Sequence, residues 1–313
     1  MQYWSMVLQM KIHKGLNLVL LLFLGFISSD SRVLAQAAPP AAAAAKHMLW
    51  KVTGQGCTVY LAGSVHFLKG SHYPLAPVIE NAFTNSQSIA FETDMKEMEA
   101  PATQFLLLEK GTYQNGDTIE KHLSPKTYGL LKQKFEEEMG TADLMTGFRP
   151  WFAAFTLVAV ELQKMGFDAS QGMDQYFHKK AQERQMTETG LEPLAVQIAM
   201  IADLGAKNEE EFVLQTISEM NDFKKEFDQI ISAWQTGNTA ALEKQLLASF
   251  KGYPDIEKKL LTDRNQSWIS KIETMLKNPE KKNAMVVVGA AHLVGKNGVP
   301  QLLQQKGYKV EQQ

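Results

Sequence analysis

The chain has 313 residues, of which 45% are hydrophobic and 21% charged, and its formal net charge is −2. This composition excludes intrinsic disorder over most of the length and allows one large core or two modest ones. Lysine and arginine do not gather apart from acidic neighbours, so nucleic-acid binding is not expected. The single cysteine, Cys57, excludes an intramolecular disulfide and a thiolate metal cluster.

Residues 1–35 have the pattern of a secretory signal peptide. Two lysines precede an apolar run over residues 16–27, and small or apolar residues end at Ala35, where a signal peptidase would cut. The run is shorter than the roughly 18–20 residues that cross a bilayer, so a permanent membrane span is disfavoured. Residues 36–47 are rich in alanine and proline and are expected to tether a single domain over residues 48–313. We therefore expect a periplasmic or secreted protein.

The folded part opens with a unit of strand, turn, helix and strand. Short strands are predicted over residues 49–52 and 58–62, with a Gly-Gln-Gly turn between them. The second strand runs into a Gly-x-x-His turn that ends at His66. A proline at the first turn and one apolar stripe predict a helix over residues 77–85, and residues 88–91 form a buried strand.

A similar unit lies near the carboxyl end. Residues 284–288 are a continuous apolar run, typical of a central strand, and they lead into a second Gly-x-x-His turn that ends at His292. A helix over residues 299–305 and a strand over residues 308–310 follow. Because the same order of elements occurs twice, internal duplication is a reasonable hypothesis. The predicted fold class is α/β, with a central mixed sheet built from these two units.

The chain between the two units is predicted to be a largely helical insertion. Residues 151–162 form a strongly apolar segment, and apolar residues recur at helical spacing over residues 213–234. A further helix over residues 256–275 carries Arg264 on its apolar stripe. A guanidinium in that position must find a partner.

Three residues of the two units form a candidate metal site. His66 and His292 each follow a strand at a turn, and Glu92 ends the strand that we expect beside the His66 strand. Open α/β sheets gather ligands at such strand ends. Two histidines and one glutamate can hold a divalent metal, which activates water for hydrolysis. The sequence predicts that all three residues are both metal ligands and catalytic.

Each of these histidines has a second interpretation. A lone histidine after a strand is more often a hydrogen-bonded structural residue, and only the paired turns favour a metal site. His72 is close enough to His66 to support it from outside the ligand set, although a surface loop is the favoured position. Nucleophilic catalysis is poorly supported, because the chain has no Gly-x-Ser-x-Gly motif and Cys57 has no nearby base.

At these residues the sequence resembles the TraB/GumN family, which is related to the Tiki metalloproteases. The resemblance spans about residues 49–310. It depends on the segments LWKVTGQGCTVYLAGSVH, IAFETD, FRPWFAAF, GMDQYFHKKA, GLEPLAVQI, DRNQSWI and VVVGAAHLVGKNGVPQLL. It implies an α/β fold with a central sheet, and a metal site formed by His66, Glu92 and His292. The related Tiki proteins are peptidases that favour manganese or cobalt, with zinc as a possible metal, and the resemblance implies the type of site and not the substrate.

Further residues match motifs of the family. Asp174 and Glu192 could orient the metal ligands, while Gln197 and Arg264 could contact substrate or a developing oxyanion. Arg149, which stands where the family often has lysine, is a third candidate for substrate binding. A structural role in helix packing or capping is an open alternative for these residues.

Two functions are compatible with the sequence. The first is an exported metal-dependent hydrolase, above all a peptidase, that acts on a peptide or cell-envelope substrate. The second is a non-enzymatic periplasmic accessory protein that uses the same pocket to hold a metal complex or an envelope ligand. An esterase would share the hydrolytic chemistry but would need a different acyl pocket. The sequence does not indicate whether the protein is a monomer or an oligomer.

Overall fold

The computed structural model describes residues 46–220, 222–248, 250 and 254–313. The predicted signal peptide and most of the predicted tether lie outside the described residues. Within the described part, no helix combines the length and the apolar character needed to span a bilayer.

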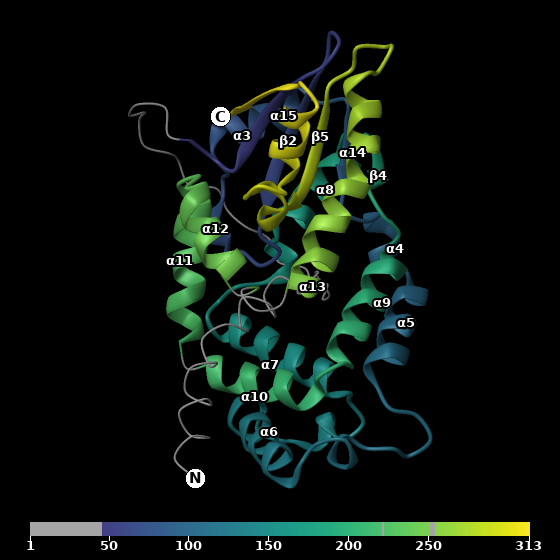
Figure 1. Ribbon diagram of the computed structural model, residues 1–313, viewed down its shortest axis with the longest axis vertical. Helices are drawn as coiled ribbons and strands as arrows, with labels where there is room; N and C mark the ends of the chain where they lie inside the picture. Colours follow the sequence, from purple (N-terminus) through teal and green to yellow (C-terminus); the bar gives the residue numbers. More distant parts are fainter. Residues whose placement is uncertain (1–45, 221, 249, 251–253) are drawn as a thin grey trace.

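Among the described residues, one mixed sheet of six strands forms the centre of the fold (Figure 1). The strands are β1 (Leu49–Thr53), β2 (Thr58–Ser64), β3 (Ser88–Phe91), β4 (Thr187–Gly190), β5 (Ala284–Gly289) and β6 (Lys309–Gln312). Their order across the sheet is β4-β3-β5-β2-β1-β6. Strands β2, β5, β3 and β4 are parallel, and β1 runs antiparallel to both β2 and β6. The predicted α/β class with a mixed sheet is confirmed.

Strand β5 lies between β2 and β3, with Ser64 paired to Gly289 and Phe91 paired to Val287. The prediction that the Glu92 strand neighbours the His66 strand is therefore wrong. The crossover from β2 to β3 leaves one position free, and β5 fills it after returning from the long insertion. Because these strands are parallel, their carboxyl ends, which lead to His66, His292 and Glu92, lie next to one another on the same side of the sheet.

Both predicted units are present with the expected helices. Helix α3 (Pro77–Thr84) follows β2, and helix α15 (Val299–Gln305) follows β5. Each begins with a proline in its first turn, where the missing N–H costs no helical hydrogen bond. The units differ in where their last strands go, because β3 pairs with β5 whereas β6 pairs with β1 at the opposite edge.

The insertion between β3 and β5 is largely helical, as predicted, but it also supplies β4 at the edge of the sheet. Its helices are α4 (Met95–Glu99), α5 (Pro101–Gly111), α6 (Pro125–Met139), α7 (Pro150–Lys164), α8 (Met173–Glu183), α9 (Leu194–Gly205), α10 (Glu209–Glu219), α11 (Phe223–Gln235), α12 (Thr239–Ala248), α13 (Pro254–Glu257) and α14 (Asp263–Leu276). The apolar stripe over residues 213–234 is thus divided between α10 and α11.

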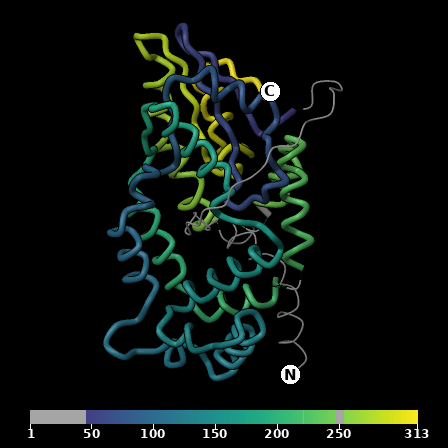
Figure 2. Tube along the Cα trace, turned by 180° about the vertical axis from the view of Figure 1, so that it is seen from behind, coloured from purple at the N-terminus to yellow at the C-terminus, as the bar shows by residue number. Residues whose placement is uncertain are grey.

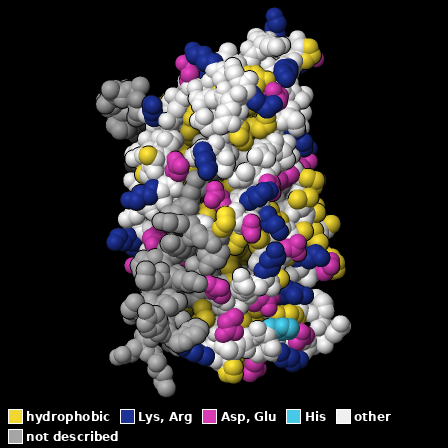
Figure 3. All heavy atoms as spheres, viewed as in Figure 1, with side chains coloured by type: hydrophobic (Ala, Val, Ile, Leu, Met, Phe, Trp, Pro, Cys, Tyr) yellow, Lys and Arg dark blue, Asp and Glu magenta, His cyan; other side chains and the backbone are white. Residues whose placement is uncertain are grey.

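A helical lobe lies at the end of the molecule opposite the sheet, and the view from behind shows the same separation (Figures 1 and 2). Helices α6, α7 and α10 contact one another there around a second, smaller core that includes Leu131, Phe135 and Val213. The larger core surrounds the sheet. On the face shown in Figure 3, basic and acidic side chains are interspersed over the surface.

The segment that leads into α14 departs from a regular helix. A π-helical turn, Lys258–Thr262, stands between α13 and α14. Arg264 follows this turn, and its Nη1 donates to the carbonyl oxygen of Leu260 at 3.0 Å. Such π-helical turns are often found at functional sites.

Candidate functional site

The side chains of His66, Glu92 and His292 surround one point above Gly289. A β-carbon placed on Gly289 would lie 3.2 Å from Glu92 Oε1, 3.6 Å from His66 Nε2 and 3.7 Å from His292 Cδ2. Gly289 has φ −50° and ψ 137°, so its role is to leave space and not to adopt a left-handed conformation. The structure thus brings the three predicted ligands together from residues far apart in the sequence.

His66 is oriented by a carboxylate behind it. Its Nδ1 is 2.8 Å from Asp174 Oδ2, and the other oxygen of Asp174 accepts a hydrogen bond from Ser64 Oγ at 3.0 Å. Because Asp174 engages Nδ1, Nε2 is the nitrogen that faces Gly289. Burial alone would lower the pKa of His66, but the charge and hydrogen bond of Asp174, helped by Glu92, raise that pKa to about 9.

The pKa of His66 predicts a pH dependence of stability. The ordinary pKa is 6.5 and the folded pKa is about 9, so the charged His66–Asp174 pair stabilises the metal-free protein fully below pH 6.5. This contribution is lost as the pH rises through about 9. We expect Asp174→Asn to lower the free energy of unfolding most below pH 6.5, with the difference from wild type shrinking toward pH 9. Urea unfolding in EDTA across this range measures it, and a wild-type His66 that titrates near 6.5 by NMR would contradict it.

Glu92 is a buried carboxylate whose two oxygens are both engaged. The backbone N–H of Gly289 donates to Oε1 at 2.7 Å, while Arg264 Nη2 at 2.6 Å and Gln197 Nε2 at 3.2 Å donate to Oε2. Burial by itself would raise the pKa of Glu92. The positive charge of Arg264, followed by the two histidines, holds that pKa well below its usual range. Glu92 is therefore ionised at neutral pH.

His292 is held as a neutral imidazole. Asn265 Oδ1 lies 2.6 Å from its Nδ1, and Arg264 Nη1 lies 3.0 Å from its Nε2. Since arginine only donates, Nε2 accepts and Nδ1 carries the proton. Burial and the charge of Arg264 lower the pKa of His292 to about 3. Its ring also contacts Trp268, with a centroid separation of 4.5 Å.

Arg264 links the two carboxylates of the site. Its side chain bonds Glu92 and also Glu192, whose Oε1 accepts from Nε at 2.7 Å. Glu192 accepts in addition from Gln197 Nε2 at 2.7 Å and from Trp268 Nε1 at 3.2 Å. Arg264 is only 8% exposed, so the predicted need for a partner is confirmed.

Two predicted site residues lie outside the cluster, and two residues of the cluster were not predicted. His72 accepts from the backbone N–H of Lys69, and Arg149 lies over the ring of Tyr113 in the helical lobe, so their contacts are outside this cluster. Asn265 and Ser64 were not predicted as site residues. Their signal was position, because Asn265 follows Arg264 and Ser64 lies inside the first Gly-x-x-His turn.

The donor set fits a divalent metal in kind, but it is not preformed. Within the residues that the structure describes, no group of three or more His, Cys, Asp and Glu side chains has the arrangement of a metal site. His66 Nε2 and Glu92 Oε1 both face the space above Gly289. Arg264 occupies His292 Nε2, so this nitrogen would bind a metal only after the guanidinium withdraws. Ligand bonds of about 2.0–2.2 Å would also require the three side chains to move closer together.

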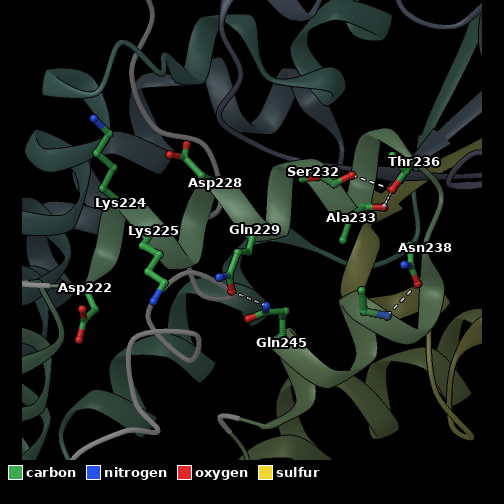
Figure 4. A pocket seen from close by; sticks show the side chains of 11 residues that line it. Asp222, Lys224, Lys225, Asp228, Gln229, Ser232, Ala233, Thr236, Asn238 and Gln245 are labelled. Atoms are coloured by element: carbon green, nitrogen blue, oxygen red, sulfur yellow. Dashed lines mark hydrogen bonds between the residues drawn. The ribbon is translucent and has the colours of Figure 1, made fainter.

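Two cavities adjoin His66 and Glu92. The first has a volume of ≈ 70 Å³ and extends toward α11 and α12, and the second has ≈ 30 Å³ and extends toward α4, α8 and α9. A separate surface groove of ≈ 770 Å³ lies on the outer side of α11 and α12, where Gln245 donates to Gln229 (Figure 4). Phe227 and Ile230, which line the first cavity, belong to the same helix α11.

The fold and the cluster define an α/β protein with a buried His–Glu–Arg–His site at one edge of a mixed sheet. The chain belongs to the TraB/PrgY/gumN family, which it matches over residues 48–312. It is 26% identical over 247 residues to the uncharacterized protein YbaP of Escherichia coli (strain K12), with 78% of this chain and 87% of YbaP covered. YbaP of Shigella flexneri gives the same values. No solved structure matches the chain.

Proposed function

We propose that this protein is an exported metal-dependent hydrolase that cleaves peptide bonds at the His66–Glu92–His292 cluster. The observation that carries the proposal is the convergence of His66 Nε2, Glu92 Oε1 and the His292 ring on the space above Gly289. Imidazole nitrogens and carboxylate oxygens are the ligands that a catalytic divalent ion uses in proteins. Here they follow the carboxyl ends of buried strands. Export is supported by the sequence pattern of residues 1–35.

The residues of the cluster have distinct tasks in this proposal. His66 and Glu92 would hold the ion, joined by His292 once Arg264 withdraws from its Nε2, and Asp174 fixes the ring of His66 so that Nε2 faces the ion. A bound divalent ion would supply a Lewis acid that activates water and polarises a carbonyl group. Arg264, once it leaves His292, is a buried cation able to stabilise negative charge on the substrate oxygen. A relationship of the family to the Tiki metalloproteases, which is part of this proposal, favours manganese or cobalt, with zinc as the third metal to test.

Metal binding by variants tests the proposal. Purified protein, stripped with EDTA and titrated with Mn²⁺, Co²⁺ or Zn²⁺ in a calorimeter, is expected to bind close to one ion. His66→Ala and Glu92→Gln should each weaken binding more than the roughly 10–100-fold typical of residues that only support a ligand. His178→Gln is the control, because His178 is also a carboxylate-paired histidine, is more deeply buried than His66, and bonds Glu188 instead of a residue of the site. Unchanged affinity in both site variants would overturn the metal site.

The second candidate function is a non-enzymatic accessory protein. One observation favours it: Arg264 pairs with both Glu92 and Glu192 and offsets part of their negative charge. Digestion of a peptide library with each metal distinguishes the two functions. Metal-dependent cleavage that Glu92→Gln abolishes supports the hydrolase, and metal binding without cleavage supports the accessory protein.

A further inference from the structure

The first cavity beside the cluster has two chemically different ends. Its polar end is formed by Ser64, His66, Glu92 and His292, which are the site residues themselves or their direct neighbours. Its other walls, among the residues that the structure describes, come from the segment after β2, from α7, α11 and α12, and from the turn after β5, and their side chains are all hydrocarbons. These walls include Phe67, Leu162, Phe227, Ile230 and Leu246, all of them buried.

A ligand that fills this cavity must be apolar away from the site. The described residues of the apolar walls offer no side-chain partner for a charge or a hydrogen-bonding group, so burying such a group against them would cost several kcal/mol, on the order of 2–7. A hydrocarbon group gains instead, by about 0.8 kcal/mol per buried methylene. The cavity therefore selects an apolar group whose other end reaches His66 and Glu92.

The volume of the cavity limits the size of that group. A dry cavity of about 150 Å³ in another protein holds one benzene molecule. The present cavity has ≈ 70 Å³, about half as much. It has room for a branched aliphatic group of roughly three or four carbons and is too small for an aromatic ring.

The second cavity differs in its walls. It shares His66 and Glu92 with the first cavity but has ≈ 30 Å³ and is lined by Met95, Met98 and the amide side chains of Gln175 and Gln197. Gln197 is 1% exposed, and its Oε1 has no hydrogen-bond partner among the described residues. The two cavities thus bracket His66 and Glu92 with one purely apolar side and one partly polar side.

We infer that the first cavity is a subsite for a valine- or leucine-sized side chain next to the bond that is cleaved. The cleavage step of this inference rests on the proposed function, whereas the binding of an aliphatic group follows from the cavity alone. Ile230 lies in the wall of the cavity, and a larger side chain there would fill it. The neighbouring Ile231 is also buried and belongs to the same core as Ile230, but it does not line the cavity.

The test combines cleavage and binding. In a metal-supplemented peptide library, wild type should prefer valine or leucine over phenylalanine and tryptophan beside the cleaved bond by at least about 10-fold. Ile230→Phe should reduce kcat/KM for the leucine peptide by about 10–100-fold, and Ile231→Phe, the control for overpacking, should leave the preference unchanged. In metal-free protein with labelled isoleucine methyl groups, acetyl-leucine-amide should shift the Ile230 signal, whereas acetyl-phenylalanine-amide should not.

The outcomes separate this inference from the proposed function. Cleavage without an aliphatic preference, or a preference that Ile230→Phe does not change, overturns the subsite and leaves the hydrolase standing. Selective binding of acetyl-leucine-amide without cleavage in any metal supports the subsite and overturns the hydrolase. The absence of both cleavage and a shift of the Ile230 signal overturns both.

Discussion

Replacing Arg264 by methionine is expected to lower the free energy of unfolding by about 3–5 kcal/mol, because it removes the partner of the buried Glu92 and of the largely buried Glu192. Arg264 bonds Glu92 and Glu192, and its other contacts, with the neutral ring of His292 and the carbonyl oxygen of Leu260, carry no charge. Methionine has a similar length but carries no charge, so Glu92 would have to take up a proton or draw water into the core. Urea unfolding of metal-free protein at pH 7 measures the loss.

A second substitution shows whether the charge pair is the cause. Arg264→Met combined with Glu192→Gln removes one of the two stranded carboxylates, so the double variant should be more stable than the sum of the single effects predicts. Arg264→Lys keeps the charge but not the planar fork that reaches both carboxylates, and it should fall between wild type and Arg264→Met. Additive effects in the double variant would contradict an ionic role for Arg264.

The structure also shows which parts of the fold were visible in the sequence. Strand β5 was predictable because a strand buried on both faces reads as a continuous apolar run, and β2 because its short segment follows another strand across a Gly-Gln-Gly turn. Strand β4 was not, because its sequence TETG is polar and half of it is exposed at the edge of the sheet. Its place in the sheet comes from parallel pairing with β3 and leaves no periodic signal in the sequence.

The order of the strands in the sheet could not be predicted either, because strand pairing leaves no local pattern in the sequence. Glu92 was expected beside the His66 strand because the two strands follow each other along the chain, but β5 is inserted between them. Which strands become neighbours depends on how the crossovers pack over the sheet, and that is a property of the whole fold. The position of β5 between β2 and β3 nevertheless favours the predicted site, because it brings His292 between His66 and Glu92.

The candidate site was predictable in its members more than in its connections. His66, His292 and Glu92 were found from residue type and position at strand ends. The sequence required a partner for Arg264 but could not reveal that one guanidinium bonds Glu92, Glu192 and His292 together. Those contacts join α14, the segment after β4 and the edge of the sheet, and only the folded chain brings them within reach.

Replacing Gly289 by alanine is expected to weaken metal binding more than about 100-fold. Mutating a residue that only hydrogen-bonds a metal ligand costs less, about 10–100-fold. The added methyl group would lie 3.2 Å from Glu92 Oε1 and 3.6 Å from His66 Nε2, in the space where the proposed ion has to bind. Calorimetric titration with Mn²⁺ or Co²⁺ measures the affinity, and peptide cleavage should fall in parallel.

The fold should tolerate this alanine, which makes the substitution a test of the space itself. Gly289 has a φ of −50°, open to any residue, and alanine lowers the entropy of the unfolded chain by the equivalent of about 0.4–1 kcal/mol, which offsets the tight contact with Glu92. Gly129→Ala, in α6 with nothing within 4 Å of the added carbon, is the matched control and should leave metal affinity unchanged. If Gly289→Ala bound metal as tightly as Gly129→Ala, the ion would have to lie elsewhere, because a methyl group and a coordinated cation cannot share one position.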